Sequence, residues 1–107
     1  MTVVAAADLE WIVERVRAHY DATAIYLFGS QAKGTPGEGS DVDLLIVGPS
    51  RLPRHRRGLQ VAAALSVFPS HFDLLFFTDE ELAEARTDRR SFISSAMLRA
   101  KVLYRRE

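Results

Sequence analysis

The sequence predicts an α/β domain with a mixed β-sheet and helices packed mainly on one face. Short apolar runs bounded by glycine or polar residues are typical of buried strands. Such runs occupy residues 24–28, 42–47 and 71–77. Between them lie segments with apolar residues at helical spacing. We therefore expect one alternating α/β unit that forms a single domain over residues 1–107.

The first helix is expected at residues 8–20 and a second within the alanine-rich residues 60–68. The apolar face of the first helix would contain Leu9, Ile12, Val13 and Val16. Thr78 followed by Glu81 is a capping-box pattern, which predicts that another helix begins near Asp79.

The C-terminal part of the chain is expected to form a helix at about residues 89–100 and a short strand at 102–104. The apolar face of that helix would contain Phe92, Ile93, Ala96 and Met97.

A glycine-serine step follows the first expected strand. Gly29 lets the backbone approach an anionic group closely, and Ser30 and the N–H groups after it can donate hydrogen bonds to phosphate oxygens. The glycines and proline within residues 34–39 disfavour regular structure. The segment thus has the composition of a phosphate-binding loop.

Carboxylates occur on two of the expected strands. Residues two apart on a strand share a face, so Asp41 and Asp43 would project in the same direction. Two hard oxygen ligands side by side favour a divalent cation such as Mg²⁺ that also holds substrate phosphates. Asp73 is the one acidic residue in an apolar run, where a carboxylate costs free energy unless it is paired or binds a metal. It is the expected third ligand of a two-metal site.

Each of these features has a simpler structural explanation when it is taken alone. Gly29 and Ser30 are also typical of a tight turn or helix cap, an Asp-x-Asp pair occurs in many turns, and Asp73 could form an edge-strand salt bridge. The order of strand, Gly-Ser, glycine-rich loop, Ser-Asp-x-Asp-Leu and a later Asp-bearing strand is far more restrictive. Together these features predict a metal-dependent nucleotidyl-transfer site.

The pattern Gly29-Ser30-x-x-x-Gly34 followed by Ser40-Asp41-x-Asp43-Leu44 resembles the signature of the nucleotidyltransferase superfamily, which includes DNA polymerase beta and kanamycin nucleotidyltransferase. Within it, the chain is most similar to the minimal nucleotidyltransferases (MNT), and the resemblance covers nearly its whole length. It implies the polymerase beta-like fold.

The resemblance also implies a role for each motif residue. The nucleotide-binding residues would be Gly29, Ser30, Gly34 and Ser40. The catalytic residues and metal ligands would be Asp41, Asp43 and Asp73. ATP would be the substrate and Mg²⁺, as two ions, the cofactor, with Asp73 also serving as the base.

Many minimal nucleotidyltransferases are antitoxins paired with a helical HEPN-domain toxin, and members of that group transfer AMP from ATP to a toxin tyrosine. The resemblance therefore implies a protein adenylyltransferase with a HEPN partner. Two alternatives stay open. The chain could be a binding module that neutralises its partner by occlusion, or a nucleotidyltransferase for a small hydroxyl compound. The length of 107 residues disfavours the latter, because no separate acceptor domain is expected.

Composition sets the expected surroundings. The absence of cysteine is compatible with a cytoplasmic protein, and no apolar stretch approaches the roughly 20 residues of a membrane span. Lys and Arg total 14, as do Asp and Glu, so direct nucleic-acid binding is not expected from net charge. Both homo- and hetero-oligomers remain open.

A basic run follows the second expected strand. It contains Arg51, Arg54, His55, Arg56 and Arg57. Its simplest interpretation is the solvated start of a helix. Contact with ATP phosphates or with an acidic partner surface is the alternative, because the planar guanidinium suits bidentate recognition of phosphate or carboxylate.

Overall fold

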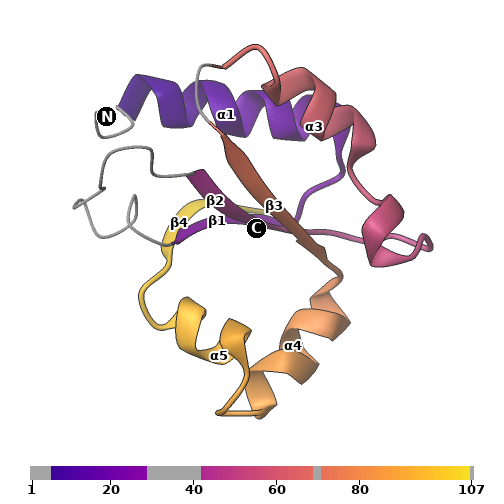
Figure 1. Cartoon of the computed structure of the whole chain (residues 1–107), viewed down its shortest axis with the longest axis vertical. Helices are drawn as coiled ribbons and strands as arrows, with labels where there is room; N and C mark the ends of the chain where they lie inside the picture. Colours follow the sequence, from indigo (N-terminus) through magenta and orange to yellow (C-terminus); the bar gives the residue numbers. More distant parts are fainter. Residues whose placement is uncertain (1–5, 29–41, 69–70, 107) are drawn as a thin grey trace.

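A single mixed β-sheet runs through the middle of the protein, as the computed structural model in Figure 1 shows; the model describes residues 6–28, 42–68 and 71–106. Within these residues the strands are β1 Ala24–Phe28, β2 Val42–Val47, β3 Phe72–Phe77 and β4 Lys101–Arg105. Their order in the sheet is β3-β2-β1-β4. β1 is antiparallel to both of its neighbours, whereas β2 and β3 are parallel. The predicted mixed sheet is confirmed.

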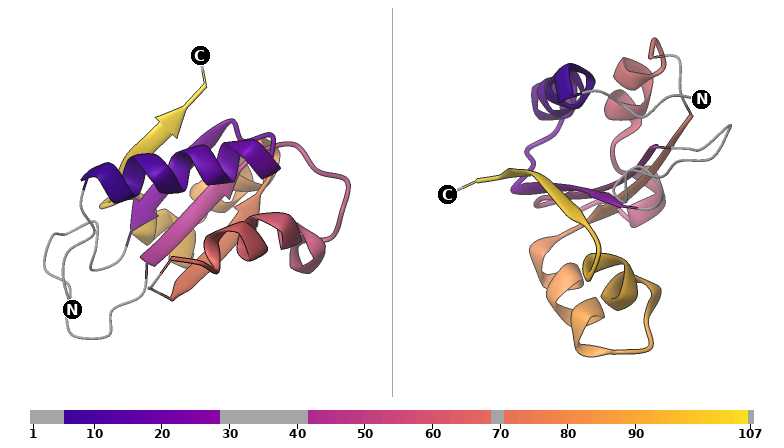
Figure 2. Two further views of the ribbon diagram at one scale, coloured as in Figure 1. Left: turned by 90° about the horizontal axis from the view of Figure 1, so that it is seen from above. Right: turned by 90° about the vertical axis from the view of Figure 1, so that its left-hand side faces the viewer.

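Helices cover both faces of this sheet, which corrects the expectation that they pack mainly on one face. The helical elements are α1 Ala6–His19, the 3-10 turn η1 Arg54–Arg56, α3 Leu59–Leu65, α4 Asp79–Thr87 and α5 Phe92–Met97. α1 and α3 lie on one face, and α4 and α5 on the other (Figure 2). No helix in the described part of the chain has the length and apolar character needed to span a membrane.

The two-sided cover follows from the composition of the central strands. Every residue of β1 is buried and none is charged, and its side chains enter the cores on both faces, so both faces need a covering layer. Ile12 of α1 and Val61 of α3 enter the core on one face. Leu82 of α4 and Ile93 of α5 enter the core on the other.

Most predicted helix boundaries are close to those observed. At the start of α4, the Glu81 amide donates to Thr78 Oγ1 at 3.1 Å and the Thr78 amide to Glu81 Oε1 at 2.9 Å, so the predicted capping box is confirmed. The expected helix over residues 89–100 is shorter. Ser91 caps α5 by accepting the Ser94 amide at 3.0 Å, and its hydroxyl donates to the Ala85 carbonyl, which fixes the later start.

Arg57 is a buried arginine that joins three elements. Its Nε donates to the Leu52 carbonyl at 2.8 Å, and one terminal nitrogen donates to the Phe76 carbonyl at 3.0 Å. Both terminal nitrogens also reach the Glu81 carboxylate, at 2.6 and 3.1 Å. This bidentate pair ties the segment before α3 to the end of β3 and the first turn of α4.

The next residue, Gly58, explains how α3 can begin so close to the sheet. Its φ is +70°, in the left-handed region that favours glycine. A Cβ atom at this position would lie 2.0 Å from Cζ of Phe76, so no other residue fits without displacing that ring.

We predict that Glu81→Gln lowers the free energy of unfolding by about 2 kcal/mol at pH 7, because it leaves a buried guanidinium without its counter-charge. The hydrogen bond from Arg57, followed by that from the Thr78 amide, lowers the pKa of Glu81 from 4.5 to about 2. The charge of Glu81 therefore stabilises the fold fully above pH 4.5, and this contribution is lost as the pH falls toward 2.

Urea unfolding followed by circular dichroism at several pH values would measure this effect. The difference between wild type and Glu81→Gln should shrink as the pH falls below 4.5. Glu80→Gln, on the exposed side of the same helical turn, is the matched control and should change stability little. A pH-independent difference, or an equal loss in the control, would contradict the assignment.

Candidate active site

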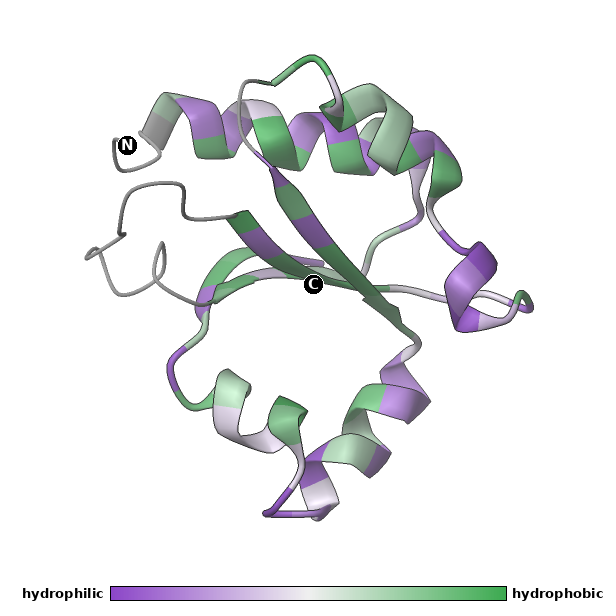
Figure 3. Cartoon of the chain, viewed as in Figure 1, coloured by the Kyte–Doolittle hydropathy of each residue, from purple (hydrophilic) through white to green (hydrophobic). Residues whose placement is uncertain are grey.

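A row of three side chains crosses the sheet at the edge where β1 ends and where β2 and β3 begin. Phe28 of β1 is paired with Asp43 of β2, and Asp43 is aligned with Asp73 of β3. Neighbouring strands are about 4.8 Å apart, so the two aspartates project from adjacent backbones. Hydrophilic bands interrupt the otherwise apolar β2 and β3 near their starts in Figure 3. Two carboxylates that are 30 residues apart in the sequence are thus neighbours in the fold.

Both carboxylates lie on the face of the sheet that α4 and α5 cover. Alternate residues of a strand share a face, and Leu45 and Val47, which follow Asp43 in this alternation, belong to the core beneath those helices. At the row itself the helices do not close over the sheet, and a hollow of about 280 Å³ remains. The described residues that line it are Phe28, Asp43, Asp73, Leu74, Leu75 and Phe92.

A larger cavity of about 580 Å³ adjoins this hollow and shares Phe28, Asp43 and Phe92 with it. The other described residues that line it come from α5 and the turn that follows, namely Ser95, Ala96, Leu98 and Arg99. The carboxylates are therefore at one side of a cleft that has both apolar and charged walls.

Asp73 is open to solvent and to a neighbouring histidine. Its side chain is 60% exposed, and its Oδ1 atom lies 3.7 Å from Nε2 of His71. A protonated His71 would form an ion pair with this carboxylate. A solvent-facing carboxylate of this kind can be reached by an external molecule.

The donor set fits a hard divalent cation. Asp43 and Asp73 present carboxylate oxygens from adjacent strands on one face, and Mg²⁺ prefers such oxygens together with water and substrate phosphates. Asp41, the third expected ligand, lies outside the described residues, as do Gly29, Ser30, Gly34 and Ser40. Among the residues that are described, no group of three potential metal ligands occurs. The described residues on either side of residues 29–41 are Phe28, at the end of β1, and Val42, at the start of β2, and both lie at this edge of the sheet.

The basic run lies elsewhere in the fold. Arg57 is buried and paired with Glu81, which raises the pKa of Arg57, and Arg54 stacks over the Phe77 ring at 4.3 Å. Phe77 is at the end of β3, four residues beyond Asp73 and thus about 13 Å further along the strand. For Arg57, neither the solvated interpretation nor the phosphate-binding one agrees with the structure.

Sequence reasoning missed the contribution of α5 to the cleft. Phe92 was expected on the apolar face of its helix, but it is 65% exposed, whereas Ile93 is buried as expected. Arg99 had no assigned role. Only the three-dimensional position of α5 beneath the sheet reveals these residues, because their spacing is that of an ordinary short helix.

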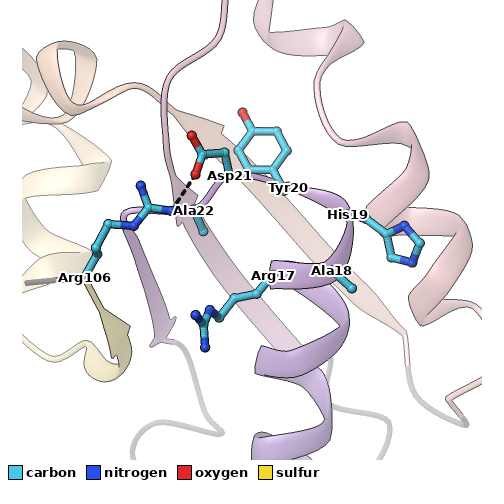
Figure 4. A pocket seen from close by; sticks show the side chains of 7 residues that line it. All are labelled: Arg17, Ala18, His19, Tyr20, Asp21, Ala22 and Arg106. Carbon is cyan, nitrogen blue, oxygen red and sulfur yellow. Dashed lines mark hydrogen bonds and ion pairs between the residues drawn. The ribbon is translucent and has the colours of Figure 1, made fainter.

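A second hollow, of about 410 Å³, opens at the opposite end of β1, beside Tyr20 and Ala22 (Figure 4). The charged groups here already have partners. Arg106 forms an ion pair with Asp21, and Arg17 lies over the Tyr104 ring at 4.3 Å. Asp21 is the one carboxylate among the described residues that line this hollow, so they offer no pair like Asp43 and Asp73.

Comparison with known proteins identifies the family. The family model described as "Nucleotidyltransferase domain" matches residues 9–102. The chain therefore belongs to the nucleotidyltransferase domain family, as its central motif suggested. No curated protein matches the chain significantly.

Solved structures confirm the expected polymerase beta-like fold. A chain of a toxin–antitoxin crystallised with AMP-PNP superimposes with a TM-score of 0.69 and 24% identity, covering 94% of this chain and 75% of that one. A structure of a mutant of the toxin–antitoxin MntA-HpeT superimposes with a TM-score of 0.66 and 19% identity, covering 92% of this chain and 74% of that one. A chain from the structure of the tri-AMPylated Shewanella oneidensis HEPN toxin in complex with MNT antitoxin superimposes with a TM-score of 0.56 and 18% identity. The match covers 91% of this chain and 69% of that one.

We predict that Mn²⁺, added as a Mg²⁺ substitute at about ten times its dissociation constant, raises the unfolding temperature of the wild type by roughly 5 °C. Asp73→Asn should lose most of this increase. Without metal, Asp73→Asn should be at least as stable as the wild type, because like charges aligned on adjacent strands repel.

Differential scanning calorimetry with and without Mn²⁺ would measure both effects. Glu10→Gln removes an exposed carboxylate from α1 and should behave as the wild type. An Asp73→Asn protein that keeps the full Mn²⁺ shift would argue against a metal site at this row.

Proposed function

We propose that the chain is a Mg²⁺-dependent nucleotidyltransferase that transfers AMP from ATP to a hydroxyl of a partner protein. The observation that carries this proposal is the alignment of Asp43 with Asp73 beside a cleft, in a chain of the nucleotidyltransferase domain family. Paired carboxylates on one sheet face suit the transfer of a nucleotidyl group, which needs charge neutralisation and alignment more than covalent help from the protein.

The residues have separate roles in this proposal. Asp43 and Asp73, together with Asp41, would hold Mg²⁺, which when bound neutralises phosphate charge and lowers the pKa of the attacking hydroxyl. The triphosphate would be bound by the loop residues Gly29, Ser30, Gly34 and Ser40.

Asp73 would also act as the base. The acceptor oxygen attacks the α-phosphorus, a new P–O bond forms, and the bond from the α-phosphorus to the bridging oxygen breaks, so that pyrophosphate leaves. The proton of the acceptor hydroxyl passes to the Asp73 carboxylate. On this proposal His71, whose Nε2 lies 3.7 Å from that carboxylate, would pass the proton to solvent through a water molecule.

A protein hydroxyl is the proposed acceptor, and a tyrosine of a HEPN-domain toxin is the specific candidate. Two observations support this. Asp73 faces solvent at β3, which is an edge strand, so a large acceptor can approach it. Among proteins of the same fold, one similar structure is an MNT antitoxin in complex with an AMPylated HEPN toxin. On this proposal the chain is an antitoxin that silences its toxin by AMPylation.

The test is transfer of label from α-labelled ATP and Mg²⁺ to a co-purified HEPN partner. The wild type should label a partner tyrosine, located by mass spectrometry. Asp43→Asn should lower the rate by about a hundredfold or more, because metal charge stabilisation is worth several kcal/mol in the transition state. Glu84→Gln, an exposed carboxylate on α4, is the matched control and should keep full activity.

The remaining outcomes separate the alternatives. A partner that is silenced without any label, by the wild type and by Asp43→Asn equally, would establish inhibition by occlusion. Label on an aminoglycoside in the absence of any partner would establish a small-molecule acceptor. Retained transfer by Asp43→Asn would overturn the assignment of the carboxylate row.

A further inference from the structure

The cavity beneath α5 adjoins the carboxylate row, shares Asp43 with it and adds a wall of α5 residues. We propose that it holds the base of the nucleoside triphosphate, stacked on the Phe92 ring, while Arg99 binds a phosphate oxygen. This inference rests on the proposed function. It assigns the base-binding role to α5, a short helix whose sequence gives no sign of it.

Phe92 has an aromatic surface that the fold does not use. Phe92 is 65% exposed, although it lines the cavity beside Asp43. Its described aromatic contact is edge-to-face with Phe28, with ring centroids 6.1 Å apart and an interplanar angle of 68°. Phe28 itself is buried and gives Phe92 an aromatic neighbour within the core. A nucleotide base stacks readily on an exposed aromatic side chain.

The Phe92 side chain is not needed to anchor α5 to the sheet. Ile93 performs that task, since it is buried in the core formed with Leu82 of α4. Leu98, at the end of α5, is 86% exposed and lines the same cavity. Two large apolar side chains facing water at one cavity indicate a surface that a ligand covers. The cavity volume of about 580 Å³ lies within the range of small-molecule sites.

Arg99 supplies the charge that such a ligand requires. It is exposed, lines the cavity together with Asp43, and forms no ion pair within the described residues. Its planar guanidinium can bind two phosphate oxygens at once. A ligand that spans Asp43 and Arg99 must carry negative charge for the arginine and bind metal for the carboxylate, and an aromatic base completes the match to Phe92. A nucleoside triphosphate has all three properties.

Isothermal titration calorimetry with Mg²⁺ and a non-hydrolysable ATP analogue tests the stacking. Phe92→Ala and Phe92→Leu should weaken binding about tenfold, whereas Phe92→Trp should preserve it, because stacking requires a ring and not merely an apolar side chain. Inorganic tripolyphosphate, which has no base, should bind all Phe92 variants and the wild type equally. Arg99→Gln should weaken the binding of both ligands.

The matched control is Leu59→Ala, which removes another exposed apolar side chain, 70% exposed, on the opposite face of the sheet. It should bind as the wild type does. Thermal unfolding should confirm that each variant is folded. Ile93→Ala, which removes the buried anchor of α5, shows how a merely structural defect would appear in the same scan.

The outcomes separate this inference from the proposed function. If the wild type binds the ATP analogue and Phe92→Ala binds it equally well, the inference is overturned while the proposed function stands. If Phe92→Ala binds the analogue normally but loses transfer to the partner, the cavity receives the protein acceptor, which also overturns the inference. If the wild type binds neither ligand, the proposed function itself fails.

Discussion

The parallel pairing of β2 with β3 is the constraint on which the site depends. Its register places Asp43 beside Asp73, and the antiparallel pairing of β1 adds Phe28 to the same row. Side chains alternate along a strand, so a slip of one residue would turn one carboxylate toward α1 and α3. The apolar core beneath α1 and α3 opposes such a slip, because the displaced carboxylate would be buried there at a cost in free energy. Core packing therefore fixes the position of the chemistry.

The two ends of β3 differ in their surroundings. At its start the sheet is open, and Asp73 faces solvent near His71. At its end the strand is held by Arg57, which donates to the Phe76 carbonyl and pairs with Glu81. The arginine stabilises the crossover from β2 to β3, since it binds the Leu52 carbonyl, the Phe76 carbonyl and the Glu81 carboxylate at once. The Arg57–Glu81 pair thus lies at the end of β3 away from Asp73, whose own side chain is exposed.

The strands are predicted well because buried strands consist of short runs of apolar residues, which can be recognised in the sequence. The runs ending at Phe28, Val47 and Phe77 were each found to within one residue, and the capping box at Thr78 gave the start of α4. The packing of helices on both faces was not predicted, because a helix at residues 79–87 has the same pattern whichever face it covers. The length of α5 was overestimated for a related reason. The apolar spacing favours a helix from residue 89, whereas Ser91 can cap a helix that begins after it, and tertiary contacts decide which start is used. Arg57 was misread because a charged residue in a basic run gives no sign of an ion-pair partner 24 residues away.

The nucleotidyltransferase assignment and the proposed roles of Asp43 and Asp73 meet in a single crystallographic test. A crystal structure of this chain with Mn²⁺ and an ATP analogue whose α,β-bridge cannot be cleaved would locate both ligands, the metal by its anomalous signal. The account predicts anomalous density between the Asp43 and Asp73 carboxylates, in contact with the α-phosphate. Nucleotide bound elsewhere, or carboxylates without metal while the triphosphate is bound, would contradict it.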